Sequence, residues 1–241
     1  MVEHIGESTT RLLVDCGFGL KHLLLRLAQA GLSPHQLDAI FITHEHGDHI
    51  GCAAALAVRF QLPLWMSAGT YAAIGSPDLM GMLRIARDGE PIEVSKMVVM
   101  PFTVPHDARE PLQLTCSQGA SKLGILTDLG HATDHVLHNL QACSALLLEC
   151  NHDADLLAQS AYPEFLKSRV SGRYGHLSNE HAASIAKAVG HEGLKVVVAA
   201  HLSLQNNTPE LAHSALTQAI AWFDTKIILA NAQHGCDWAE A

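Results

Sequence analysis

The sequence predicts an α/β fold, and three observations support this class. Short apolar runs alternate with segments of helical spacing along the whole chain. The 241 residues are 48% hydrophobic and 16% charged, which is typical of a globular protein with a sizeable core. Residue types that bind metals stand where several of the predicted strands end. The sequence contains no repeat, no low-complexity tract and no flexible linker, so we expect one domain over residues 1–241.

The individual elements follow from the spacing of the apolar residues. Short apolar or alternating runs predict strands, which in chain order are residues 11–15, 38–43, 63–66, 97–104, 112–116, 122–127, 145–149, 195–200 and 226–230. Apolar residues three or four positions apart predict helices, which are residues 20–30, 50–60, 179–189 and 209–223. The weakly patterned residues 75–90 are expected to form a surface excursion.

Charge and cysteine content limit the function classes. A net charge of −9 argues against a protein that coats nucleic acid non-specifically, but it allows an enzyme that meets nucleic acid at one local patch. The six cysteines form no CxxC pair and are expected to be buried, reduced thiols. No signal peptide and no apolar run of about 18 residues is present. We therefore expect a cytoplasmic protein without membrane contact.

The stretch ITHEHGDH, residues 42–49, is the densest group of metal-ligating residue types. His44 and His46 are two positions apart and point to the same face of an extended backbone. Gly47 allows a turn, after which Asp48 and His49 enter the first turn of the next predicted helix. The alternative, a helix cap with surface histidines, would account for Asp48 but not for the grouping of His44, His46 and His49. The motif therefore predicts a metal site.

Further candidate ligands follow three other strands. His106 comes after the strand at 97–104, with His131 as its substitute, Asp128 ends the strand at 122–127, and His201 ends the strand at 195–200. With the four residues of the motif, these make seven ligands, enough for two metal ions. Nitrogen and carboxylate donors together suit zinc, manganese or iron.

In this order of motifs, the sequence resembles the metallo-β-lactamase superfamily over nearly the whole chain. The matching residues are Asp15 in LLVDCG, the THEHGDH motif, the later His106, Asp128 in TD, and His201 in HLS. The resemblance implies an αββα sandwich, in which two mixed sheets are flanked by helices. Relatives usually begin with a strand and a loop rich in Gly and Ser, whereas only MVEHIGEST precedes residue 10, so the N-terminal strand is expected to be truncated.

The resemblance also implies two divalent metal ions, zinc or manganese, with iron as a further option. One ion would be held by His44, His46 and His106, and the other by Asp48, His49 and His201. Asp128 would bridge them. Asp15 would fix the motif loop instead of binding metal.

Residues 149–179 resemble the WalJ/YycJ-type branch, which comprises bacterial DNA exonucleases. The shared features are Asn-His-Asp, Tyr-Pro, Leu-Lys-x-Arg and Gly-His-Leu-Ser-Asn, although Cys150 stands where the branch usually has Ser. The layout is also similar to that of the tRNA-processing nuclease Z branch. By that analogy Glu149 would orient His176, which would act as general acid. His152 is a candidate substrate contact, with a surface turn as the alternative.

A basic segment lies close to His176 in the sequence. Lys167, Arg169 and Arg173 alternate with Tyr162 and Tyr174. Cations beside aromatic rings can hold phosphates and stack bases, so we predict that the three cations bind substrate. The alternative is an ordinary solvated helix face.

These features predict a metal-dependent phosphodiesterase or nuclease, and specifically a 5′–3′ DNA exonuclease that uses a metal-bridging hydroxide. Asp48, Glu149 and His176 are the predicted catalytic residues, with DNA or another phosphodiester as the substrate. The alternative is a small-molecule hydrolase of the same fold, such as a thioesterase, lactonase or cyclic phosphodiesterase. A metal-free binding module is disfavoured because all seven candidate ligand residues are present.

Overall fold

The structure, a computed structural model, describes residues 1–240 and divides into two compact units. Unit 1 comprises residues 1–103 and 108–112, and unit 2 comprises residues 104–107 and the chain from Gln113 onward. Among the described residues, no helix is both long enough and apolar enough to cross a bilayer.

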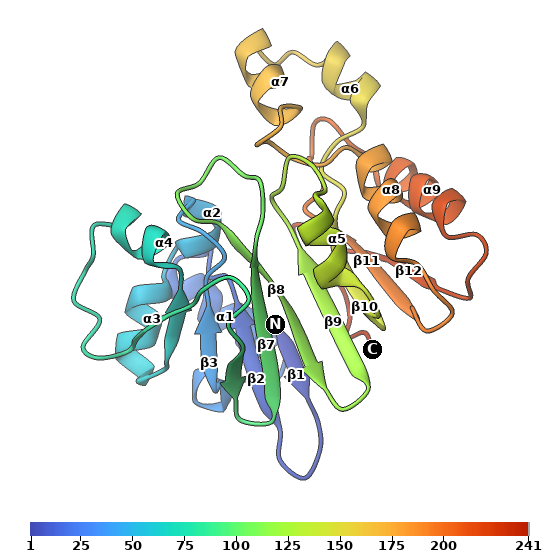
Figure 1. Ribbon diagram of the computed structural model, residues 1–241. Helices are drawn as coiled ribbons and strands as arrows, with labels where there is room; N and C mark the ends of the chain where they lie inside the picture. Colours follow the sequence, from blue (N-terminus) through green and yellow to red (C-terminus); the bar gives the residue numbers. More distant parts are fainter. Residues whose placement is uncertain (241) are drawn as a thin grey trace. The chain divides into compact units, whose positions relative to one another are not determined.

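Unit 1 contains a five-stranded sheet in the order β1-β2-β3-β4-β5 (Figure 1). β1 is antiparallel to β2, and the remaining neighbours are parallel, so the sheet is mixed. β6 and β7, which follow in the chain, belong to the other sheet and are antiparallel to each other. The strands are β1 (Val2–His4), β2 (Thr10–Val14), β3 (Ala39–Phe41), β4 (Leu64–Met66), β5 (Leu83–Ile85), β6 (Ile92–Val94) and β7 (Met97–Thr103).

The helices of unit 1 pack their apolar sides on this sheet. Leu23 and Leu27 share a buried cluster with Leu56 and with Ile40 of β3. β3 is buried along its whole length, as expected for a strand with parallel neighbours on both sides. The helices are α1 (Leu20–Gln29), α2 (Gly47–Ile50), α3 (Ala53–Phe60) and α4 (Ala68–Ala73), and a 3-10 turn covers Pro34–Gln36.

The single helix predicted at residues 50–60 was wrong at its start. Two helices, α2 and α3, are separated at Gly51, which has a positive φ of 29°. A Cβ at Gly51 would lie 2.2 Å from the carbonyl oxygen of Cys16, so only glycine fits here. The break leaves Asp48 and His49 on their own short turn, held against the segment after β2.

Unit 2 contains the strands β8 to β12. β8 and β9 are antiparallel, whereas β9, β10, β11 and β12 are parallel neighbours in that order. The strands are β8 (Leu112–Gln118, with Leu112 in unit 1), β9 (Ser121–Leu126), β10 (Ala145–Glu149), β11 (Val196–Ala200) and β12 (Lys226–Leu229). The helices are α5 (Asp134–Leu140), α6 (Ala154–Gln159), α7 (Glu164–Val170), α8 (Asn179–Val189) and α9 (Pro209–Ala219). α8 and α9 lie side by side (Figure 1).

The predicted fold class is confirmed, because the chain forms two mixed sheets flanked by helices. The elements missed by the sequence analysis are short: β1, β5, β6 and α4 to α7 span three to seven residues each. Residues 75–90 were expected as a surface excursion, but β5 lies within them and pairs with β4 through Leu64 and Leu83.

The parallel strands place the predicted site residues at their carboxyl ends. In unit 1, Asp15 follows β2, and the motif at 42–49 follows β3, its parallel neighbour. In unit 2, Asp128 follows β9, Glu149 ends β10 and His201 follows β11. Carboxyl ends of adjacent parallel strands lie at one edge of a sheet, so each unit gathers its own cluster of polar side chains.

Candidate active site

Asp15 holds the motif loop of unit 1 in place. It adopts a left-handed backbone conformation, with a φ of 58°. Its Oδ1 accepts a hydrogen bond from the Thr43 amide at 2.9 Å, and its Oδ2 accepts one from Nδ1 of His49 at 2.8 Å. Because Nδ1 of His49 faces Asp15, its Nε2 points away from Asp15. These two hydrogen bonds are the contacts that the role predicted for Asp15 requires.

Three histidines of the motif converge. Nε2 of His44 lies 3.0 Å from Nδ1 of His46, and the ring centroids of His44 and His49 are 4.1 Å apart. Two nitrogens bound to one tetrahedral zinc ion at about 2.0–2.1 Å would be about 3.3 Å apart. The spacing of His44 and His46 is therefore close to that of two ligands of one ion.

The two acids of the motif have different surroundings. The Asp48 side chain is 70% exposed, and its Oδ2 is 3.7 Å from Nε2 of His49, so both ligand atoms face the same space. Glu45 instead anchors the loop: its carboxylate accepts from the Arg109 amide at 2.7 Å and from Oγ1 of Thr70 at 3.4 Å. Asp48 is therefore exposed beside His49, whereas Glu45 is bonded within unit 1, and the ligand role of Asp48 stays a prediction.

Glu149 is the centre of the cluster in unit 2. It is fully buried, and its Oε1 accepts from Nδ1 of His176 at 2.9 Å and from Nδ1 of His201 at 2.7 Å. Its Oε2 accepts from the amides of Leu177 at 3.0 Å and Leu129 at 3.3 Å. One carboxylate therefore orients two imidazoles and leaves Nε2 of each pointing away from it.

The contact of Glu149 with His176 was predicted from the sequence, whereas its contact with His201 was not. The parallel register of β10 and β11 pairs Glu149 with Ala200, the residue before His201. His201 then turns toward the carboxylate with a positive φ of 58°. The missed signal was therefore the pairing of the two strands, which periodicity alone does not reveal.

Asp128 completes this cluster. It is buried, has a positive φ of 54°, and places Oδ1 at 3.2 Å from Nδ1 of His176 and 3.4 Å from Nδ1 of His201. One ligand atom from each of Asp128, Glu149, His176 and His201 lies within 4.8 Å of the others. Carboxylate and imidazole donors suit a divalent cation, and of these four residues Asp128 and His201 are the predicted ligands.

Burial and charge act in opposite directions on these groups. Burial lowers the pKa of His176, but hydrogen bonds to Asp128 and Glu149 outweigh it and raise the pKa to about 10. Burial lowers the pKa of His201, but its hydrogen bond to Glu149 and the charges of Asp128 and Glu149 together outweigh burial, so the net pKa is raised. Burial raises the pKa of Glu149, but its bonds from both histidines leave the net pKa below the ordinary value. A divalent cation would therefore compete with protons for this cluster.

His106 lies in unit 2 beside the same cluster. Its Nδ1 donates to the carbonyl of Gly175 at 3.1 Å, and its ring centroid is 5.4 Å from that of His176. Burial lowers the pKa of His106, which favours the neutral form that binds metals. His131, its substitute, donates from Nδ1 to the carbonyl of Arg173 at 2.9 Å.

His152 is buried with 2% of its surface exposed. Its Nδ1 has no hydrogen-bond partner among the described residues, and burial lowers its pKa to about 4. Its backbone carbonyl accepts from the amide of Asn179 at 2.8 Å, at the start of α8. Contact with substrate would require its ring to become accessible, so that role stays a prediction.

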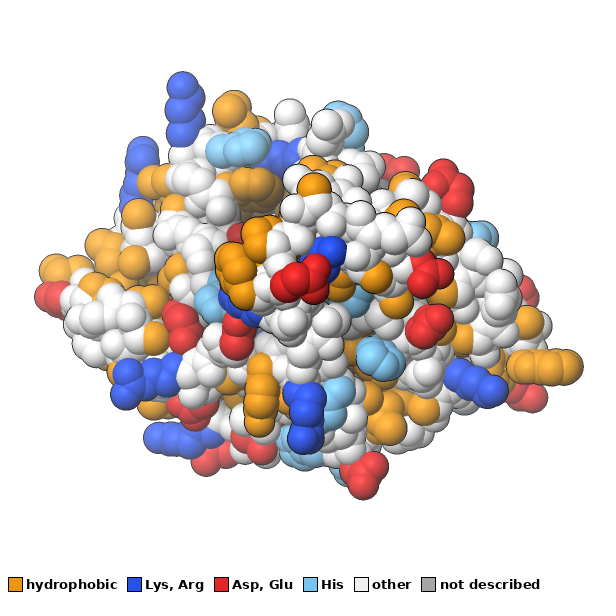
Figure 2. Space-filling view, turned by 90° about the horizontal axis from the view of Figure 1, so that it is seen from above, with side chains coloured by type: hydrophobic (Ala, Val, Ile, Leu, Met, Phe, Trp, Pro, Cys, Tyr) orange, Lys and Arg blue, Asp and Glu red, His pale blue; other side chains and the backbone are white. Residues whose placement is uncertain are grey.

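The three predicted substrate-binding cations differ in their availability. Lys167 is mostly buried and donates to the carbonyl of Ala158 at 2.7 Å, which ties α7 to α6. Arg169 pairs with Asp107 at 2.7 Å, and the side chain of Arg173 is exposed. Figure 2, seen from the side on which α6 and α7 stand in Figure 1, shows hydrophobic side chains beside charges of both signs. Of the three, Arg173 has the surroundings best suited to binding a phosphate.

Each unit thus gathers the site residues that it contains. Unit 1 brings together Asp15, His44, His46, Asp48 and His49, and unit 2 brings together His106, Asp128, Glu149, His176 and His201. His152 is buried three residues after Glu149, and the basic residues lie on α7 and the turn that follows it.

Histidine- and aspartate-rich strand ends on two mixed sheets define a metal-binding α/β protein, and comparison with known proteins gives its family. The model of the family described as the beta-lactamase superfamily domain matches residues 10–202, and the chain belongs to this superfamily. The resemblance noted in the sequence is therefore confirmed.

Two curated relatives and one solved structure are particularly similar. Exodeoxyribonuclease YycJ of Bacillus anthracis is 32% identical, over 90% of this chain and 83% of the relative. Exodeoxyribonuclease WalJ of Streptococcus pneumoniae is 31% identical, over 92% and 84%. The solved structure of the metallo-beta-lactamase fold protein YhfI of Bacillus subtilis is 19% identical in sequence. It aligns over 95% of this chain and 87% of the YhfI chain with a TM-score of 0.72, which shows the shared fold.

Proposed function

We propose that the protein is a metal-dependent nuclease that cleaves phosphodiester bonds in DNA, and specifically a 5′–3′ exonuclease. The observation that carries the proposal is the hydrogen bond of 2.9 Å between the buried Glu149 and His176, next to Asp128 and His201. The relatives that align over most of the chain are named exodeoxyribonucleases, which supports exonuclease activity on DNA.

We propose two divalent metal ions, zinc or manganese, as cofactors. The residues that would hold them are His44, His46, Asp48, His49, His106, Asp128 and His201. Their nitrogen and carboxylate donors suit either metal, and the spacing of His44 and His46 supports the assignment. When bound, such ions act as Lewis acids and activate water at neutral pH.

His176 is proposed as the general acid. Water adds to phosphorus, the bond from phosphorus to the 3′ oxygen breaks, and that oxygen needs a proton as it leaves. Glu149 and Asp128 both face Nδ1 of His176, so the proton would be donated from Nε2. The carboxylates keep the imidazole protonated and fix its direction. Proton transfer by a positioned general acid typically contributes about 10²–10⁴-fold in rate.

The substrate strand is proposed to run past the turn that follows α7. Arg173 would hold a backbone phosphate, and the exposed Tyr174 would offer a ring on which a base can stack. Arg169 would contribute if its pair with Asp107 opened. Lys167 would act mainly by holding α7 against α6.

A comparison of substrates tests the proposal. Purified protein with manganese or zinc is incubated with linear DNA labelled at its 5′ or 3′ end, with closed circular DNA, and with a chromogenic phosphodiester, a thioester and a β-lactam. We expect early release of label from the 5′ end and no cleavage of the circle. Turnover of the thioester or the lactam without cleavage of DNA would overturn the nuclease assignment and favour a small-molecule hydrolase.

A further inference from the structure

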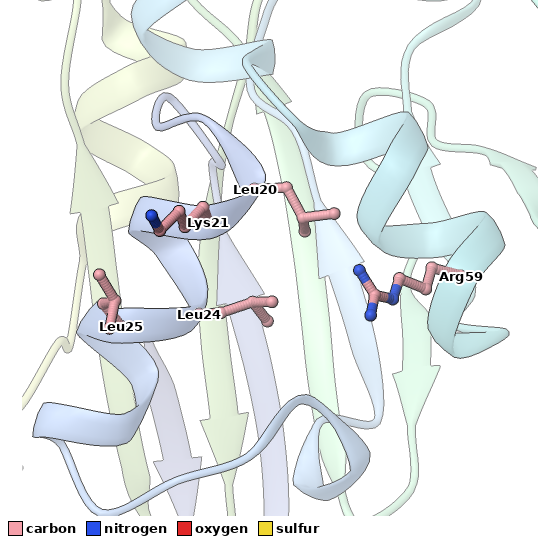
Figure 3. A pocket seen from close by; sticks show the side chains of 5 residues that line it. All are labelled: Leu20, Lys21, Leu24, Leu25 and Arg59. Atoms are coloured by element: carbon pink, nitrogen blue, oxygen red, sulfur yellow. The ribbon is translucent and has the colours of Figure 1, made fainter.

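Unit 1 carries a groove between α1 and α3, and none of its lining residues belongs to the ligand motif. Leu20, Lys21, Leu24 and Leu25 of α1 and Arg59 of α3 line it, and its volume is about 430 Å³. Figure 3 shows Leu20 and Leu24 directed toward Arg59, which reaches back toward α1 from the neighbouring helix. The volume is within the range of about 300–1,000 Å³ that is common for binding sites.

Several leucines of α1 lie in the groove and not in the buried core. Leu23 and Leu27 bury themselves in the core of unit 1, whereas Leu20 and Leu24 remain only partly buried at its margin. Leu25 lies in the middle of α1 and is 55% exposed. The leucines of α1 therefore extend from the core-facing side onto the surface, a pattern that marks a binding face when the apolar groups are contiguous.

The two segments that contain the groove helices carry cations and no acidic residues. The net charge of the protein is −9, yet residues 16–37 and 49–77 contain no Asp or Glu. Lys21, Arg26 and Arg59 are the lysines and arginines of these two segments. The helices that form the groove thus present cations beside leucines, which complements a partner that combines carboxylates with apolar side chains.

We infer that this groove binds an acidic peptide segment of a partner protein, anchored by large apolar side chains between Leu24 and Arg59. Nucleic acid fits less well, because the lining has leucines and no aromatic ring on which a base could stack. A membrane surface fits less well because apolar side chains line a hollow instead of a crest. This inference does not depend on the proposed nuclease activity.

The test uses a fluorescein-labelled peptide of alternating acidic residues and leucine or phenylalanine, titrated with the full-length protein. We expect saturable binding that weakens with salt, and binding about tenfold weaker or more for Lys21→Glu with Arg59→Glu. Leu25→Gln should also weaken binding, without changing its salt dependence. Lys187→Glu, an exposed charge reversal on α8, serves as the matched control and should bind like the wild type.

Three further probes decide between the alternatives. An acidic peptide without apolar residues should bind weakly. Single-stranded DNA and anionic vesicles should each bind the wild type and the double variant, Lys21→Glu with Arg59→Glu, to the same extent. Binding of DNA or vesicles that depends on Lys21 and Arg59 would overturn the choice of a peptide partner. Failure of the acidic, apolar peptide to bind, or equal binding by all variants, would overturn the groove as a docking site. Nuclease assays of the same variants should remain unchanged.

Discussion

Replacing Glu149 by Gln tests the buried carboxylate on which the cluster in unit 2 depends. Glu149 is fully buried and accepts four hydrogen bonds, two from imidazoles and two from backbone amides. Glutamine has nearly the same shape but carries no charge and has only one accepting oxygen. Its amide group would therefore face either the donors of His176 and His201 or those of Leu177 and Leu129.

The expected loss follows from the loss of a buried charge. Removing one partner of a buried ion pair typically costs about 3–5 kcal/mol, whereas domains are stable by about 5–15 kcal/mol. The variant should therefore fold, with a melting temperature lowered by about 6–20 °C, at roughly 2–4 °C per kcal/mol for a chain of this size. Because the pKa of Glu149 is lowered in the folded state, its contribution is present above the ordinary carboxyl pKa and is lost as the pH falls.

The assay is urea unfolding at pH 7 of both proteins after removal of metal with EDTA. Glu90→Gln is the matched control, because Glu90 is 62% exposed and pairs with Arg87 on the surface, where such pairs are worth at most about 1 kcal/mol. Metal binding, measured by titration calorimetry, should also weaken for Glu149→Gln, since His201 loses its orientation. A destabilisation below about 1 kcal/mol with unchanged metal affinity would refute this reasoning.

Three other predictions concern single side chains. His176→Ala should keep its metal content but lose about 10²-fold or more of its rate on DNA and far less on a nitrophenyl phosphodiester; equal losses on both would make His176 a binding or structural residue. Arg173→Ala should weaken DNA binding and lower the salt slope by about one unit, whereas Lys167→Ala should mainly lower thermal stability; an unchanged slope for Arg173→Ala would remove it from the substrate path. His152 has a pKa of about 4 when folded and an ordinary value of 6.5, so protonation of the unfolded state should cost about 3 kcal/mol of stability between pH 6.5 and 4. His152→Gln should flatten that pH dependence in urea unfolding, and an unaltered slope would contradict the assignment.

Sequence patterns predicted those features that depend on local spacing. The long strands and helices, the position of the motif after β3 and the strand-end positions of Asp128 and His201 all follow from periodicity in short windows. β1 and β5 were missed because three-residue strands carry little pattern of their own and are stabilised by the neighbour with which they pair.

Features that depend on distant contacts were not predictable in this way. The break between α2 and α3 arises because Gly51 packs against the carbonyl of Cys16, which is 35 positions earlier. The double role of Glu149 arises from the pairing of β10 with β11. Lys167 was predicted from the sequence to bind substrate, and its hydrogen bond to the carbonyl of Ala158, nine positions earlier, depends on how the chain turns between α6 and α7.

The most direct test of the proposed function is the metal dependence of DNA cleavage. Protein stripped with EDTA is mixed with end-labelled linear DNA, and manganese or zinc is then restored in increasing amounts to the wild type and to His46→Ala. We expect no cleavage without metal, recovery of cleavage in the wild type as about two ions bind per chain, and little recovery in the variant. Cleavage that persists after metal is removed would contradict the proposed function. Full recovery of cleavage by His46→Ala when metal is added back would also contradict it.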